Sequence, residues 1–540
     1  MRRFADLLGT LVLTPSRNGK LRLLIDYFRT VPDPERGYAL AALTRDLDIP
    51  SVKPAMLREL VAARVDDELF RLSYDYVGDL AETIALIWPA RAGELAGRND
   101  APTLAEVVET LQAVSRREGP ALVRSWLDRL DASGRYALIK LATGGFRIGL
   151  SARLAKQALA NFGDVPVNEI EELWHGLAPP YASLFAWLEG IGPKPVSAAA
   201  APFRPVMLSH AIEPEDFSRL DPADFAAEWK WDGIRVQATA ERGVARLYSR
   251  TGDDISGAFP DLVDHLAFEG TIDGELLVAH PEAGAVRIGS FSDLQQRLNR
   301  KSLTSKILRD YPAYLCAYDL LIDTGEDLRA VPFAERRARL ESFVAPLDPE
   351  RFGVSPLLDF STWDELAALR ADPPEAIIEG VMIKRRAAPY LPGRPKGEWF
   401  KWKRDARLVD AVLMYAQRGH GKRSGYYSDY TFGVWRGVPE EGDLVPVGKA
   451  YFGFTDEELK VIDKFVRDNT IERFGPVRSV RATPDFGLVL EVAFEGINRS
   501  ARHKSGVAMR FPRINRLRWD KPPREADRLE TLERMIADTE

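Results

Sequence analysis

The sequence has 540 residues, a formal net charge of −6 and one cysteine, and 45% of its residues are hydrophobic. A chain of this length exceeds what one hydrophobic core supports, so we expect several domains. Cys316 alone can form neither an internal disulfide nor a zinc site of several cysteines, and no apolar run reaches the length of a membrane span. These features predict a cytoplasmic protein without a membrane segment.

The chain begins with a helical pattern. Apolar residues recur at three- and four-residue spacing, for example in Ala39–Thr44 and Pro54–Val61. The stretch Ile191–Pro202 is rich in proline, glycine and alanine, which indicates a linker. We therefore expect an all-helical first domain, including this linker, over residues 1–200.

Beyond the linker the pattern changes to strands. Ile234–Ala240 and Val244–Ser249 alternate around a short turn and predict a hairpin. Helical patterns such as Ala334–Val344 are interspersed with the strands. This mixture predicts an α+β domain over residues 201–404.

The last region combines several short strands with one helix. The expected strands are Val409–Ala416, Tyr430–Trp435, Leu444–Gly448 and Gly487–Phe494, and the expected helix is Asp456–Arg467. This set predicts an OB-fold β-barrel over residues 405–540, a fold whose face commonly binds nucleic acid. The segment from Arg499 to Lys521 is basic although the whole chain is acidic, which suits contact with a phosphate backbone.

One lysine in the α+β region has an unusual set of neighbours. The stretch is Glu228-Trp-Lys-Trp-Asp-Gly-Ile-Arg235, and in extended backbone Glu228, Lys230 and Asp232 share one face. A free lysine, with a pKa of about 10.4, is protonated at neutral pH. Attack through its nitrogen therefore needs nearby cations, burial or a metal ion. The stretch predicts a nucleophilic Lys230, and the alternative is an edge strand with a solvated lysine between two core tryptophans.

Further short motifs follow this lysine. In chain order they are Ser249-Arg250-Thr251-Gly252, Asp273-Gly-Glu275-Leu-Leu, Tyr318-Asp319-Leu-Leu, Glu379-Gly-Val-Met-Ile-Lys384, Trp399-Phe-Lys401-Trp-Lys403 and Arg510-Phe-Pro-Arg513. With the Lys-x-Asp-Gly core at Lys230, this order resembles the ATP-dependent DNA ligases, in particular the bacterial three-domain type with an N-terminal helical DNA-binding domain. The resemblance covers residues 35–521.

A glycine- and arginine-containing segment of the helical region carries the same resemblance. Lys140–Ser151 is similar to the DNA-binding signature of that domain, and it includes Arg147 and Gly149. Its glycines would let a loop backbone approach DNA phosphates, and Arg147 could pair with one of them. A helix cap followed by a tight turn is the alternative interpretation.

The resemblance implies a role for each matching residue. Lys230 is the catalytic residue that becomes linked to AMP. The expected nucleotide-binding residues are Glu228 at the base edge, Tyr318 as the stacking aromatic, Glu275 near the ribose, Arg235 and Arg250 near the ribose and phosphates, Arg394 as a further nucleotide contact, and Lys384, Lys401 and Lys403 toward the phosphates. Mg²⁺ is expected on Glu379, with Glu275 and Asp232 as further candidates. Arg510 and Arg513 are expected to orient the leaving pyrophosphate.

One of these residues has a spacing that needs a special backbone. Lys384 lies an odd number of residues after Glu379, so the two would face opposite sides of an unbroken strand. A phosphate contact by Lys384 therefore requires a strand end or a β-bulge.

The implied activity is the sealing of nicks in duplex DNA, by a monomer, through lysyl-AMP and DNA-adenylate. The same lysine-centred core occurs in RNA ligases and mRNA-capping enzymes, which are the alternatives. The helical DNA-binding signature favours a DNA ligase. NAD-dependent ligases are disfavoured because their four-cysteine zinc module needs more than Cys316. A non-catalytic binding module would leave the ordered nucleotide motifs unexplained.

Overall fold

The computed structural model describes the chain outside residues 50–51, 78, 90–100, 145, 147, 198, 283–284, 299–302, 419–425, 475–476, 501–502 and 538–540. The described residues group into two compact units. One unit is formed by residues 156–405, and the other comprises residues 1–155 and 406–540. Within the described part of the chain, no helix is long and apolar enough to cross a membrane.

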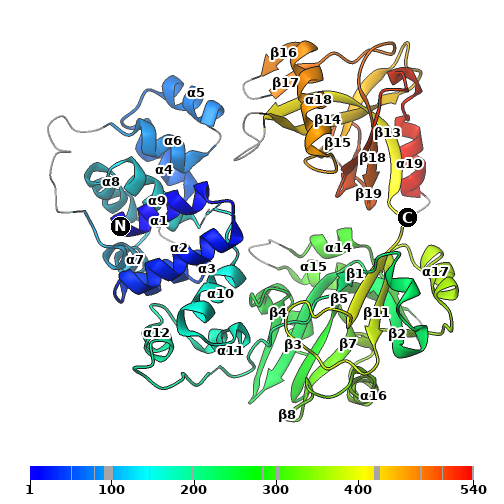
Figure 1. Ribbon diagram of the computed structural model, residues 1–540, viewed down its shortest axis with the longest axis horizontal. Coiled ribbons are helices and arrows are strands. Elements are labelled where there is room, and N and C mark those ends of the chain that lie inside the picture. Colours follow the sequence, from blue (N-terminus) through cyan, green and yellow to red (C-terminus); the bar gives the residue numbers. More distant parts are fainter. Residues whose placement is uncertain are drawn as a thin grey trace. The chain divides into compact units, whose positions relative to one another are not determined.

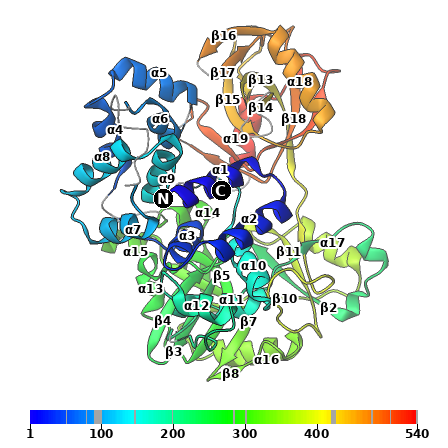
Figure 2. The ribbon, with the colours of Figure 1, turned by 60° about the vertical axis from the view of Figure 1, so that its left-hand side comes forward.

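Residues 1–155 are helical (Figure 1), and Figure 2 shows the same helices from a second side. The helices are α1 (Arg2–Leu13), α2 (Arg17–Thr30), α3 (Glu35–Thr44), α4 (Pro54–Ala62), α5 (Asp67–Val77), α6 (Leu80–Ile87), α7 (Leu104–Ala113), α8 (Gly119–Arg129) and α9 (Ala132–Thr143), and α10 (Ala152–Gly163) runs into the next unit. Helix α9 packs against α1 and α6. The apolar spacing of the sequence produces this core, in which Leu8, Leu24 and Phe28 are completely buried.

The unit of residues 156–405 contains two β-sheets with short helices. Its helices are α11 (Val167–Leu173), α12 (Ala182–Leu188), α13 (Pro260–Val263), α14 (Phe291–Gln295), α15 (Ser305–Asp310), α16 (Phe333–Val344) and α17 (Trp363–Ala371). One sheet has the order β1-β12-β11-β2-β10, formed by β1 (His210–Ala211), β2 (Phe225–Trp231), β10 (Leu357–Leu358), β11 (Ile378–Arg385) and β12 (Trp399–Lys403).

The second sheet of this unit has the order β4-β3-β5-β7-β8. Its strands are β3 (Ile234–Glu241), β4 (Val244–Ser249), β5 (Gly270–Glu282), β7 (Ala313–Asp323) and β8 (Glu326–Asp327), with β6 (Ala285–Ile288) beside β5 and β9 (Phe352–Val354) beside β7. The predicted hairpin is confirmed as β3 and β4, and the predicted helix at Ala334–Val344 as α16. Each sheet has its own apolar cluster, around Leu315 and Ile272 in this one and around Val381 and Phe225 in the other.

Helices α11 and α12 belong by contact to this unit, although the predicted boundary lies near residue 200. His175, which follows α11, packs on the rings of Phe203 and Tyr248. Glu172 pairs with Arg329 at 2.6 Å. The division of the chain into functional domains at residues 200 and 404 stays a prediction.

Residues 406–540 are rich in strands. They contain β13 (Arg407–Arg418), β14 (Tyr427–Arg436), β15 (Asp443–Ala450), α18 (Asp456–Asp468), β16 (Thr470–Phe474), β17 (Val477–Val480), β18 (Val489–Phe494), β19 (Gly496–Arg499), β20 (Val507–Arg510), β21 (Arg513–Arg518) and α19 (Leu529–Ala537). The main sheet has the order β15-β14-β13-β17-β16, and β18 pairs with both β13 and β21. All four predicted strands and the predicted helix are present, so the predicted fold class of helical, α+β and β-rich regions is confirmed.

Candidate active site

The site is built around a row of residues across three strands of one sheet. In this row Lys230 of β2 lies opposite Gly380 of β11, and Gly380 lies opposite Lys403 of β12. The Lys230 Nζ donates a hydrogen bond to Oε2 of Glu379 at 2.7 Å, and the Lys403 Nζ is 3.5 Å from the same oxygen. The Lys230 side chain is 22% exposed, so it is partly screened from water and still accessible. Two ammonium groups therefore share one carboxylate.

A β-bulge in β11 positions that carboxylate. The pairing of β11 with β2 shifts register between Ile378 and Gly380. Gly380 has φ +150°, and a Cβ there would collide with the carbonyl oxygen of Trp402 and lie 2.8 Å from the Cα of Lys403. Only glycine fits this close approach of β12. The irregular backbone that the spacing of Glu379 and Lys384 required is thus present.

Further cations gather near Lys230. The pKa of Lys401 is lowered by burial first, and then by the positive charges of Lys403, Arg394, Lys230 and Arg250. These residues come from β2, β12 and the segments after β4 and before β12. We call Lys401, Lys403, Arg394 and Arg250 the cation group. Such a concentration of positive charge suits an anion such as a phosphate chain.

The opposite sheet contributes a tightly bonded arginine. Arg235 of β3 donates to both carboxylate oxygens of Asp273, at 2.5 and 3.2 Å, and to the hydroxyl of Tyr390 at 3.1 Å. That hydroxyl donates in turn to Asp273 at 2.6 Å. Burial would lower the pKa of Arg235, but the charge of Asp273 holds it well above its ordinary value. The guanidinium is thereby fixed 5.8 Å from the centre of the Tyr318 ring.

Two of these residues were missed by sequence reasoning. Asp273 had a signal, because it belongs to the Asp273-Gly-Glu275 motif, although no role was expected for it. Tyr390 has no local signal. Its partner Asp273 lies 117 residues earlier in the chain, so only the fold brings the two together.

Glu275 is the second carboxylate near Lys230. Burial raises its pKa to about 7, while the charges of Lys230 and Arg235 oppose the rise and that of Glu379 adds to it. Glu275 and Glu379 are the pair that could take a divalent cation, because Mg²⁺ typically uses one or two carboxylates and completes its shell with substrate phosphates and water. The described residues contain no group of three or more side chains that could hold a metal ion, so Asp232 does not form such a group with Glu275 and Glu379.

The buried end of the site contains Glu228. It is only 2% exposed, and its Oε1 accepts from the Lys384 Nζ at 3.2 Å and from Nη1 of Arg337 at 3.4 Å. Lys384 also donates to the carbonyl of Tyr318 at 3.3 Å and lies 4.5 Å from the centre of its ring. The structure therefore places Lys384 beside Glu228, where the phosphate contact expected for it stays untested. Arg337 was not predicted, because nothing in the pattern of α16 distinguishes it from a surface arginine.

The remaining predicted residues lie in other parts of the chain. Arg510 ends β20, where burial lowers its pKa and its guanidinium lies 5.3 Å from the centre of the Phe511 ring, and Arg513 begins β21. Gly149 follows α9 with φ +61°, and its carbonyl accepts from the Lys20 Nζ at 2.9 Å. Arg147 lies outside the described residues.

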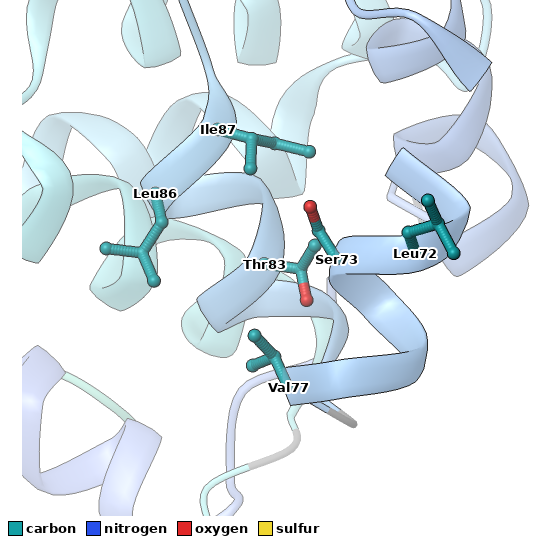
Figure 3. Close-up of a pocket in the computed structure, with 6 residues that line it drawn as sticks. All are labelled: Leu72, Ser73, Val77, Thr83, Leu86 and Ile87. Carbon is teal, nitrogen blue, oxygen red and sulfur yellow. The ribbon is translucent and has the colours of Figure 1, made fainter. Parts of the chain in front are cut away.

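A separate apolar pocket of about 360 Å³ lies between α5 and α6 (Figure 3). Its described lining residues are Leu72, Ser73, Val77, Thr83, Leu86 and Ile87. These described residues are aliphatic or hydroxyl-bearing, so none of them is a titratable group for catalysis.

Three family models match the chain. They are the DNA ligase N terminus over residues 1–160, the ATP dependent DNA ligase domain over residues 206–403 and the ATP dependent DNA ligase C terminal region over residues 423–521.

Named relatives align with most of the chain. A probable DNA ligase of Koribacter versatilis (strain Ellin345) is 34% identical over 473 residues, which are 80% of this chain and 77% of the relative. A protein named DNA ligase 1 of Korarchaeum cryptofilum (strain OPF8) is 30% identical over 554 residues, with 98% and 97% covered. A solved structure described as Pmar-Lig_PreS3 has a TM-score of 0.60 at 15% identity, covering 95% of this chain and 99% of its own. This last likeness concerns the fold alone.

Proposed function

Because the chain belongs to the ATP-dependent DNA ligase family, we propose that it seals nicks in duplex DNA through an AMP adduct on Lys230. Family membership confirms the resemblance drawn from the motifs. It also favours a DNA ligase over the RNA ligase, mRNA-capping and non-catalytic alternatives. The proposal concerns the residues that perform the reaction and the form of DNA that is sealed.

The observation that carries the proposal is the position of Lys230. Its Nζ is hydrogen-bonded to Glu379 and lies within electrostatic reach of Lys401. Lys230 is thus a partly exposed amine with a base at 2.7 Å and the cation group close by. An amine, a base and an anion-binding cluster together are what attack on a phosphate requires.

In the first step Lys230 attacks the α-phosphorus of ATP. The proton that Nζ must lose can pass to Oε2 of Glu379. The new N–P bond forms as the bond from the α-phosphorus to the bridging oxygen breaks, and pyrophosphate leaves with the electron pair. The cation group, with Lys401 at its centre, would hold the phosphates and offset the charge that builds up on them.

The next two steps transfer the AMP and close the nick. An oxygen of the DNA 5′-phosphate attacks the adenylate phosphorus, the N–P bond breaks, and Lys230 regains a proton. The 3′-hydroxyl then attacks the 5′-phosphorus, AMP leaves, and the hydroxyl proton is lost to a base. In both steps Glu228, Tyr318 and Arg235 would hold the nucleotide by its base and ribose.

Mg²⁺ is the proposed metal cofactor. Glu275 and Glu379 fit it because they are two carboxylates that interact electrostatically in the same site. A bound ion would supply charge neutralisation for the phosphates. Asp232 stays a further candidate from the sequence.

The two terminal regions have proposed roles that rest on the family resemblance. Arg510 and Arg513 would orient the leaving pyrophosphate. Gly149 and Arg147 would contact DNA phosphates. We also propose that the protein acts as a monomer in the cytoplasm, where its single Cys316 suits a reducing compartment.

The decisive experiment is the reaction of Lys230→Ala with ATP labelled in its α-phosphate. Wild-type protein should retain covalent label, and the variant should lose it with an unchanged melting curve, because no other amine takes this position. Lys306→Ala, an exposed lysine of α15 in the same unit, is the matched control and should label normally. Label retained by a folded Lys230→Ala protein would contradict the assignment.

The substrate class is tested separately by sealing a 5′-phosphorylated nick. ATP, NAD⁺ and GTP are compared as cofactors on DNA and RNA strands. Efficient sealing should require ATP and DNA strands. Equal sealing of RNA strands would favour the RNA ligase alternative.

A further inference from the structure

The buried end of the active site contains an arginine that belongs to none of the sequence motifs. Arg337 lies in α16 and is only 5% exposed. Besides its contact with Glu228, its Nη2 donates to the carbonyl of Ser355 at 2.6 Å, and its Nε donates to Glu341 at 2.9 Å. Each of the three guanidinium nitrogens of Arg337 therefore donates to an acceptor, which fixes the orientation of the group.

Both cations that contact Glu228 approach the same oxygen. Arg337 Nη1 and Lys384 Nζ lie 3.4 and 3.2 Å from Oε1. Among the described residues, hydrogen bonds to this carboxylate reach Oε1 only. A carboxylate held at one oxygen keeps the other as an oriented acceptor for a donor on a ligand.

Burial makes these cations necessary. An ionised carboxylate that is 2% exposed is unfavourable unless positive charge compensates for its lost hydration. Burial accordingly raises the pKa of Glu228, and Lys384 and then Arg337 oppose this rise, while the charge of Asp319 adds to it. Cys316 also faces this carboxylate, but burial and the nearby negative charges keep its thiol protonated.

We propose that Arg337 is a positioning residue for nucleotide selection, which with Lys384 holds Glu228 as an oriented carboxylate that accepts the 6-amino group of adenine. The inference rests on the proposed function, because it assigns the base of the nucleotide to the Glu228 end of the site. It extends that function by naming a helix residue, outside every motif, on which the choice of base depends.

The chemistry predicts how purine bases should differ. Adenine has an amino donor at position 6, unsubstituted purine has no polar group there, and hypoxanthine has a carbonyl oxygen. A fixed carboxylate attracts the amino group of adenine and repels the carbonyl oxygen of hypoxanthine. With unsubstituted purine, the carboxylate oxygen has no donor to pair with.

The test measures the first step with ATP, purine riboside 5′-triphosphate and inosine 5′-triphosphate on the full chain. The readout is the amount of covalent nucleotide–protein adduct in single turnovers. Wild-type protein should prefer ATP by roughly ten- to a hundredfold in kcat/KM, as expected for a lost hydrogen bond to a charged acceptor. Arg337→Met should reduce this preference to within about threefold, mainly by raising KM for ATP. Arg337→Lys should restore part of it.

Two further variants separate positioning from general damage. Arg339→Met lies on the same helix, where Arg339 pairs with Glu326 and Glu335 at the surface, and should keep the wild-type preference. Glu228→Gln has a neutral amide that needs no cation, so adding Arg337→Met to it should change the preference little. This double-mutant comparison isolates the coupling between the two residues.

Each outcome has a distinct meaning. A wild-type protein that forms no adduct with any triphosphate would refute the proposed function itself. An active Arg337→Met protein that keeps the full ATP preference, or loses activity equally with all three nucleotides, would overturn the inference and leave the ligase assignment intact. If Arg337→Met does not fold, Arg337→Lys takes its place in the cycle: an ATP preference below wild type in this variant, with no further change when it is added to Glu228→Gln, supports the coupling, and an unchanged preference contradicts it.

Discussion

Glu379 and Glu275, the two carboxylates near Lys230, differ in their surroundings, and this difference gives them different proposed roles. Glu379 is paired directly with Lys230 and Lys403. Glu275 interacts with Lys230 only through charge, and burial raises its pKa to about 7. Glu379 is therefore the immediate partner of Lys230, the proposed nucleophile, while Glu275 changes charge near neutral pH and so alters the electrostatic potential around Lys230.

Glu275 gives a prediction about pH and stability in the protein without nucleotide or metal. Its ordinary pKa is 4.5 and its folded pKa is about 7, so the folded chain holds its proton in the window where the unfolded chain releases it. The free energy of unfolding should therefore fall as pH rises from about 4.5 to about 7, by at most about 3 kcal/mol from this residue.

Glu275→Gln should remove this contribution. Urea unfolding of both proteins at pH 5, 6, 7 and 8 in EDTA measures it, and the variant should gain stability relative to wild type as the pH rises, with the gain complete above pH 7. A constant difference across the four pH values would show that Glu275 is not perturbed.

At the scale of elements, the bulge of β11 determines where Glu379 lies. Gly380→Ala should displace β12, because the added Cβ meets the backbone of Trp402 and Lys403 and the φ of +150° disfavours alanine. We expect a loss of roughly 1–3 kcal/mol in stability, as for other overpacked sites, and a slower first step.

The measurements for Gly380→Ala are thermal unfolding and AMP–protein formation. Gly257→Ala is the matched control, because nothing lies within 4 Å of its added Cβ and its φ is ordinary. If both variants behaved like wild type, β12 would not approach β11 as closely as the structure shows.

A second element-scale prediction concerns the loop after α9. Lys20 of α2 is 7% exposed and donates to the carbonyls of Ile148 and Gly149 at 2.5 and 2.9 Å. Lys20→Met leaves both carbonyls without this donor, which costs about 1–3 kcal/mol. If the loop contacts DNA phosphates, affinity for a nicked duplex should fall several-fold while AMP–protein formation is unchanged.

Arg22→Met, an exposed change on the same helix, is the control for Lys20→Met. Fluorescence anisotropy with a labelled nicked duplex at fixed salt measures the affinities. Equal affinities of the two variants would mean that the order of this loop does not matter for DNA binding.

Local periodicity predicted the elements well, because strand alternation and helical spacing are properties of short segments. The alternation around Lys230 also correctly placed Glu228 and Lys230 on one face of β2, as their partners Lys384 and Glu379 on β11 show. What the sequence could not show are contacts between distant segments. Arg337 contacts Glu228 although the two residues are 109 positions apart in the sequence, and no local pattern of α16 indicates that pairing.

At the scale of the whole chain, the contacts of Glu172 in α11 and of His175 after it indicate where the chain can be divided. The linker at Ile191–Pro202 was predicted from its composition. Composition indicates how flexible a backbone segment is, but it does not show which neighbouring segments pack together. The structure adds that His175 packs on Phe203 and Tyr248 and that Glu172 pairs with Arg329. A fragment that begins at residue 200 therefore lacks contacts that its own core uses.

Two fragments test this division and the proposed role of the helical region. Residues 152–540 and 200–540 should both form the AMP adduct, because every nucleotide motif lies within them. The longer fragment should melt roughly 5 °C higher, since it keeps the contacts of Glu172 and His175. Both should bind nicked DNA orders of magnitude more weakly than the full chain, with a salt dependence flatter by about one unit for each lost phosphate contact. Equal melting temperatures would show that α11 and α12 do not stabilise the unit. Wild-type affinity and salt dependence in either fragment would show that the helical region does not provide the main DNA contacts.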